Sequence, residues 1–214
     1  MKKLLLLPVF ILTLNSCLGI SANIQMRNDG SARMALEYKL SRMAETIGRL
    51  DGNEKWPIVP VGRADWERTA ARISDMRIVS FSSRENEKDI TNRVTLEFAN
   101  TEALLKFLDP AGKRASISRE NNINKLNIIL NEKVSSEINP DLMDLIKQVS
   151  AGYKFNLTFS AQRNSSVAFT DGSGKTITQP AGSNVTASGR TVSFDIDTAE
   201  IIDKKDGLGV SFSW

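Results

Sequence analysis

The sequence of 214 residues contains no histidine and only one cysteine, Cys17. Without histidine, the chain by itself cannot form a catalytic triad or a zinc site that depends on an imidazole group. With one cysteine it cannot form an internal disulfide, so its stability must come from a packed apolar core. An enzymatic mechanism would have to rely on carboxylates, lysines and serines.

Long apolar stretches and an excess of either charge are also missing. The most apolar stretch, Leu4 to Leu14, has 11 residues, which is too short to span a bilayer. The chain has 28 basic and 25 acidic residues, and without Lys2 and Lys3 the numbers are 26 and 25. This near-balance gives no electrostatic reason to expect nucleic acid as a partner.

The first 17 residues have the order of a secretory signal. Lys2 and Lys3 precede the apolar stretch, and the small Ser16 follows it at the place of a cleavage site. The stretch Leu14-Asn15-Ser16-Cys17 resembles the lipobox of bacterial lipoproteins, in which the cysteine is acylated and becomes the first residue of the mature chain. The resemblance implies cleavage between Ser16 and Cys17 and attachment to a membrane through acylated Cys17.

This resemblance gives an expected layout and location. Residues 1–16 are a lipoprotein signal peptide, residues 17–22 an acylated stem, and residues 23–214 a folded domain. The protein is then lipid-anchored in the bacterial cell envelope. Leu18 is not the aspartate that marks inner-membrane retention in enteric bacteria, so the outer membrane is favoured in a host with two membranes. A secretory signal with a coincidental cysteine is the alternative.

Hydrophobic periodicity predicts antiparallel β-hairpins alternating with amphipathic helices up to about residue 150. The Asp29-Gly30 turn lies between two runs with alternating apolar residues, which predicts a hairpin over residues 24–40. A second hairpin is predicted over residues 76–98 and a third over residues 115–130. Helices are predicted over residues 41–50, 63–74 and 101–108, and from Asn139 onward.

From Gly152 the composition changes to serine, threonine, glycine and asparagine with short alternating apolar runs. This pattern predicts a β-rich C-terminal part over residues 152–214. Because no flexible linker marks the change, we expect a single α+β domain, with a subdomain break near residue 151 as the alternative. The predicted strands are residues 154–161, 167–170, 176–179, 191–196 and 208–214, with a helical turn at 198–202.

Three side chains are candidates for a functional site. Asp195 and Asp197 lie two apart on a predicted strand and project the same way, so their oxygens could hold Ca²⁺ or Mg²⁺. Because Phe194 and Ile196 alternate with them, the simpler interpretation is the solvent face of an amphipathic strand, and we expect no metal. Trp56, in a loop with two prolines, either contacts a ligand or partner or folds over the edge of the core.

Other features resemble LppM-like lipoprotein domains. They are Asn28-Asp29-Gly30-Ser31 in the opening hairpin, an α+β middle part, and the strand Ser188 to Phe194 with a final Trp214. The resemblance implies a cell-envelope lipoprotein with lipid or partner binding, and it transfers no catalytic residue.

The expected function is a non-enzymatic binding or structural module, without cofactor, for a partner protein or an apolar envelope ligand. The alternative is a carboxylate- or metal-dependent envelope enzyme centred on Asp195 and Asp197.

Overall fold

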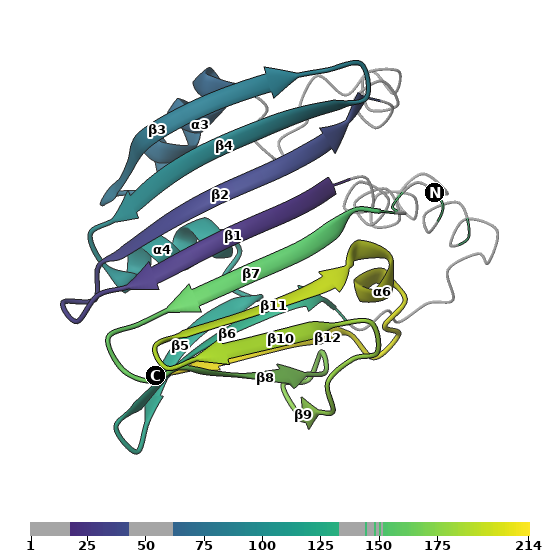
Figure 1. Cartoon of the computed structure of the whole chain (residues 1–214). Helices are drawn as coiled ribbons and strands as arrows, with labels where there is room; N and C mark the ends of the chain where they lie inside the picture. Colours follow the sequence, from purple (N-terminus) through teal and green to yellow (C-terminus); the bar gives the residue numbers. More distant parts are fainter. Residues whose placement is uncertain (1–17, 43–61, 133–143, 145–147, 149, 151) are drawn as a thin grey trace, which may run out of the picture.

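The computed structural model describes residues 18–42, 62–132, 144, 148, 150 and 152–214. Strands dominate this part of the chain and form two sheets (Figure 1). The helices among the described residues are α3 (Arg63–Arg72), α4 (Thr101–Leu108) and α6 (Thr198–Ile202). The helices predicted over residues 41–50 and from Asn139 fall largely outside the described residues.

The larger sheet has seven strands in the order β10-β11-β7-β1-β2-β4-β3. Strands β1 and β7 are parallel, and every other neighbouring pair is antiparallel. The strands are β1 (Leu18–Met26), β2 (Ala32–Ser41), β3 (Met76–Glu85), β4 (Asp89–Phe98), β7 (Lys154–Ser160), β10 (Asn184–Ser188) and β11 (Thr191–Asp197).

The smaller sheet has five strands, all antiparallel, in the order β5-β6-β12-β8-β9. It lies behind the β7, β11 and β10 part of the larger sheet in Figure 1, while α3 and α4 lie behind the other part. Its strands are β5 (Ala115–Glu120), β6 (Ile123–Asn131), β8 (Ser166–Thr170), β9 (Thr176–Ile177) and β12 (Leu208–Ser213).

The two sheets share one apolar core, because alternate residues of each strand point inward. Phe159 of β7 stacks on Phe212 of β12, with ring centroids 5.0 Å apart. Phe194 of β11 meets Phe169 of β8 edge to face at 5.5 Å. These aromatic pairs join the sheets. The same core cluster contains Ile24 and Leu126, so residues on both sides of position 151 contribute to it.

Helix α3 covers another part of the larger sheet. Its Trp66 is fully buried and donates a hydrogen bond from Nε1 to the Tyr38 hydroxyl at 3.2 Å. Burial raises the pKa of Tyr38 to about 12, so its hydroxyl stays neutral. Among the residues described, every helix is too short or too polar to cross a bilayer.

The mixed α+β composition expected from the sequence is confirmed, with the sheets dominant. Regular alternation of hairpins with helices is not shown, because only α3 and α4 separate hairpins within the described residues. The predicted hairpins over residues 24–40, 76–98 and 115–130 are confirmed, as is the helical turn at 198–202.

One boundary and one strand differ from the predictions. The expected stem of residues 17–22 is wrong from Leu18 onward, because β1 already begins there and pairs Leu18 with Leu40 of β2. Strand β10 was not predicted, since Asn184–Ser188 contains one large apolar residue. It is held by its backbone pairing with β11 at the edge of the sheet.

Asp109 fixes the connection between α4 and β5. This buried carboxylate accepts hydrogen bonds on Oδ2 from the backbone N–H groups of Arg114 and of Ala115, the latter at 3.0 Å. Burial by itself raises the pKa of Asp109, but the backbone N–H donors outweigh it and hold the pKa below its ordinary value of 3.8.

Ionised Asp109 should therefore stabilise the fold above its ordinary pKa, and this contribution should be lost as the pH falls through the lowered pKa. We expect Asp109→Asn to lower the free energy of unfolding by about 1.5–3 kcal/mol at pH 7. The difference from wild type should shrink as the pH falls below about 4. Urea unfolding at pH 7 and pH 3 measures both values, and an unchanged difference at the two pH values would contradict this role.

Candidate anion-binding pocket

A cavity of about 510 Å³ lies at one end of the molecule, where turns from both sheets meet. Its volume falls within the range of roughly 300–1,000 Å³ that is common for small-ligand sites. In Figure 1 this end is at the lower left, between the β1–β2 turn and the C-terminus. The described lining residues are Met26, Arg27, Asn28, Gly30, Thr101, Ile117, Arg119, Asn124, Gln162, Arg163 and Trp214.

The sheet topology brings these distant residues together. Because β1 and β7 are parallel, Arg27 after β1 and Arg163 beyond β7 lie at the same end of the larger sheet. The pairing of β6 with β12 brings the β5–β6 hairpin there too. At that point the Asn124 N–H donates to the Trp214 carbonyl at 2.9 Å, and the Trp214 N–H donates to the Asn124 carbonyl at 3.0 Å.

Arg119 and Arg163 converge on a single residue, Asn122. The Arg119 guanidinium donates to the Asn122 side-chain oxygen, and Arg163 Nη1 donates to the Asn122 carbonyl at 3.4 Å. Asn122 has a φ of 67° in the tight β5–β6 turn, a conformation that asparagine tolerates. Within the described part of the chain, neither arginine forms an ion pair with a carboxylate, so both positive charges stay uncompensated.

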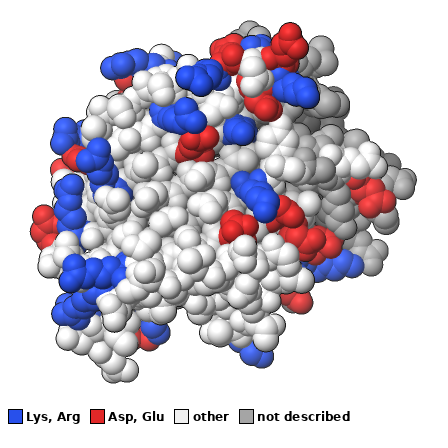
Figure 2. Space-filling view, viewed as in Figure 1, with Lys and Arg blue, Asp and Glu red and all other residues white. Residues whose placement is uncertain are grey.

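Arg27 is partly neutralised. Its Nη2 lies 3.8 Å from Glu97 Oε1. The same Glu97 side chain lies 4.0 Å from Arg33 and also pairs with Arg77. Glu97 thus pairs with three arginines, and Arg27 also interacts electrostatically with Asp29. Figure 2 shows lysine and arginine side chains gathered along its left edge, where this end of the molecule lies.

Uncharged groups complete the pocket. The amide side chains of Asn28, Asn124 and Gln162 line it and make no hydrogen bond to another described residue. Trp214 is half-buried, and its ring lies 4.9 Å from that of Phe159. Thr101 belongs to the first turn of α4, whose N-terminal end carries partial positive charge. No aspartate or glutamate belongs to the described lining residues, and the side chains suit an anion.

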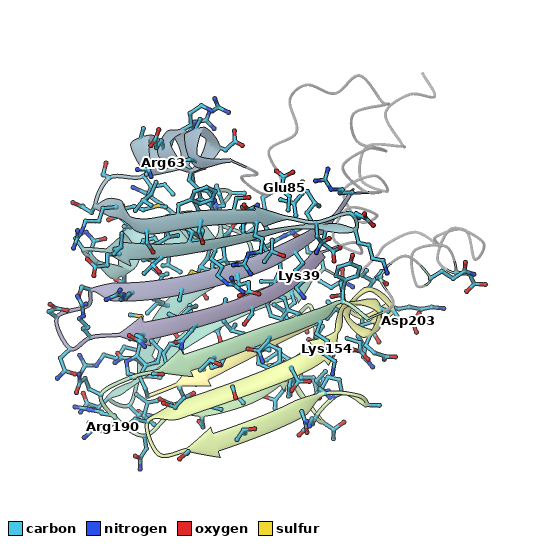
Figure 3. The ribbon with its side chains drawn as sticks, turned by 45° about the horizontal axis from the view of Figure 1, so that its top comes forward. Lys39, Arg63, Glu85, Lys154, Arg190 and Asp203 are labelled. Atoms are coloured by element: carbon cyan, nitrogen blue, oxygen red, sulfur yellow. The ribbon has the colours of Figure 1, made fainter. Side chains whose placement is uncertain are left out.

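The candidate residues from the sequence lie elsewhere. Cys17, its neighbour Ser16 and also Trp56 fall outside the described residues. Asp195 and Asp197 lie on the outer face of the larger sheet, with Lys154 Nζ at 3.5 Å from Asp195 and 4.0 Å from Asp197. Figure 3 shows Lys154 at the end of the sheet where β1 begins, whereas Arg190 marks the opposite end. Across the residues the structure describes, no group of three histidine, cysteine, aspartate or glutamate side chains could hold a metal.

The sequence offers only a weak sign of the pocket. Each pocket arginine stands near a turn asparagine: Arg27 before Asn28, Arg119 before Asn121, and Arg163 before Asn164. An asparagine beside an arginine indicates a turn. It does not indicate which turns lie together in the fold, because their positions depend on the order of the strands in the sheets. The parallel pairing of β1 with β7 places their turns at the same end of the larger sheet, and no local pattern predicts this pairing.

No protein-family model matches this chain, and no curated protein is detectably similar to it. The resemblances to the lipobox and to LppM-like lipoprotein domains therefore stay predictions from the sequence. The geometry of the pocket is the observation that bears on function.

Proposed function

We propose that the protein is a lipid-anchored component of the bacterial cell envelope that binds an acidic ligand or partner in the arginine-lined pocket. The observation that carries the proposal is the convergence of Arg119 and Arg163 on Asn122 without a carboxylate partner among the described residues. A pocket with this charge favours an acidic group over the apolar ligand expected from the sequence. The signal-like N-terminus and Cys17 support the envelope location.

The position of β1 supports a simple arrangement at the membrane. Cys17 is bonded directly to Leu18, the first residue of β1. The 9 residues of β1 span roughly 30 Å at about 3.3 Å per residue. A lipid on Cys17 would hold the start of β1 near the bilayer, and the pocket at the other end of β1 would face away from it. In a host with two membranes, we propose the outer membrane as the site of attachment.

Binding without catalysis fits the groups that line the pocket. General acid–base chemistry needs a group that exchanges protons near neutral pH, and arginine does not. At Asp195 and Asp197, the alternative enzymatic centre, the Lys154 ammonium already supplies positive charge to both carboxylates. We therefore propose a binding function and no cofactor.

Reversing one charge in the pocket tests this function. We expect Arg163→Glu to weaken binding of an acidic peptide, tetraglutamate, at least about tenfold, equivalent to ~1.4 kcal/mol. Binding of tetraglutamate to wild type should also weaken as salt concentration rises, because the charges of the exposed pocket arginines are screened. The measurement is calorimetric titration of the full-length protein, purified from membranes in mild detergent.

Arg190→Glu is the matched control, because Arg190 is exposed at the same end of the sheet but does not line the pocket. It makes the same change in net charge and should alter the affinity less than about twofold. Equal losses in the two variants would mean that general charge, and not the pocket, attracts the ligand.

A further inference from the structure

The pocket presents three kinds of group at once. Arg119 and Arg163 supply guanidinium groups that no described carboxylate neutralises. Gln162 and Asn124 supply amide groups with no hydrogen bond to another described side chain or backbone group. Trp214 supplies part of an aromatic ring that rests on Phe159. A ligand that fills this cavity must pair with the guanidinium groups, form hydrogen bonds with the amide groups and pack against the aromatic ring.

Each kind of group matches a different part of an acidic sugar. Guanidinium groups bind carboxylate, sulfate and phosphate groups through paired hydrogen bonds. Amide side chains both donate and accept hydrogen bonds, as the hydroxyl groups of a sugar require. An indole ring offers a flat apolar surface for the C–H groups on one face of a sugar ring. A simple inorganic anion would use the arginines and leave the amides and the ring without a role.

We infer that the ligand is an acidic sugar unit of a glycan, an inference that rests on the proposed function and narrows its ligand class. The cavity of about 510 Å³ has room for a sugar unit of a chain that continues into solvent. Trp214 is prepared for this contact, because its stacking on Phe159 and its backbone pairing with Asn124 fix the ring before the ligand arrives.

The position of the pocket bears on the source of the sugar. Headgroups of the membrane that holds Cys17 would lie at the start of β1, whereas the pocket lies at its far end (Figure 1). With β1 directed away from the bilayer, acidic lipids of that membrane would be out of reach. The glycan is a separate molecule or belongs to a facing surface of the envelope.

Titration of the full-length protein in mild detergent with two probes of equal net charge at neutral pH tests the inference. The probes are tetragalacturonate, an acidic oligosaccharide, and the peptide tetraglutamate. We expect tetragalacturonate to bind wild type at least about ten times more tightly than tetraglutamate. Arg163→Glu should weaken the binding of both probes.

Two further variants separate recognition of the sugar from recognition of the charge. Gln162→Ala and Trp214→Leu should each reduce the preference for tetragalacturonate at least about threefold, while the affinity for tetraglutamate changes less than about twofold. Gln162 is exposed in the β7–β8 loop, so its replacement leaves the core intact even if Trp214→Leu disturbs β12.

The remaining outcomes distinguish the proposed acidic-ligand function from the inference that the ligand is an acidic sugar. If tetraglutamate binds as tightly as tetragalacturonate, the sugar inference is overturned and the acidic-ligand function stands. Tighter binding of glycerophosphoglycerol, the headgroup of phosphatidylglycerol without its acyl chains, than of tetragalacturonate would also overturn the sugar inference. If none of these acidic probes binds, both the inference and the proposed function fail.

Discussion

Replacing Phe212 with alanine is expected to lower the free energy of unfolding by about 3–5 kcal/mol. Phe212 is fully buried in β12, and its ring stacks on Phe159 at 5.0 Å and lies 6.2 Å from Phe194. These rings belong to different sheets, so the substitution opens a cavity where the sheets meet. A loss of this size is a large part of the roughly 5–15 kcal/mol that stabilises a typical domain.

Urea unfolding of the full-length protein measures this loss. The control is Val79→Ala, which also shortens an apolar side chain, at a position of β3 that is 41% exposed. It should cost less than about 0.5 kcal/mol. A loss below about 1 kcal/mol for Phe212→Ala would contradict a core shared by the two sheets.

Replacing Cys17 with serine is expected to abolish acylation and stop lipoprotein processing. The thiol of Cys17 is the only one in the chain, and serine offers no sulfur to which the diacylglyceryl group can be attached. Stable anchoring requires more than one acyl chain, so the variant should lose its attachment through lipid. It should keep the apolar stretch Leu4 to Leu14, because cleavage before residue 17 is also lost. Metabolic labelling with a fatty acid and detergent partitioning measure the two effects.

A cysteine placed elsewhere in the chain tests whether acylation depends on the position of the thiol. Ser188→Cys, placed on the exposed edge strand β10 in the Cys17→Ser background, restores a thiol away from the signal. It should not restore labelling. If the Cys17→Ser protein still incorporates fatty acid and partitions as wild type does, the lipobox interpretation is wrong.

Much of the fold could be predicted from local patterns. The hairpin of β1 and β2 follows from an Asp-Gly turn between runs with period-two alternation, and α6 was predicted over the residues that form it. The edge strand β10 was missed, because its stability comes from β11 and not from its own sequence. Where pairing with a neighbour decides the structure, a local pattern cannot reveal it.

The pocket could not be predicted for the same reason. Arg27, Arg119 and Arg163 are far apart in the sequence and form no motif. They meet because β1 pairs with β7 within one sheet and β6 pairs with β12 within the other. Asp195 and Asp197 attracted attention because they are close in sequence, yet in the fold they lie beside Lys154.

The most direct test of the account is to follow side-chain NMR signals of the protein during titration with tetragalacturonate and with tetraglutamate. The Nε–H signals of Arg119 and Arg163 should shift together, while that of Arg190 stays in place. The Trp214 indole signal should shift more with the sugar. If no signal of the pocket moves with either probe, or if shifts appear only around Asp195 and Asp197 when Mg²⁺ or Ca²⁺ is added, the account is contradicted.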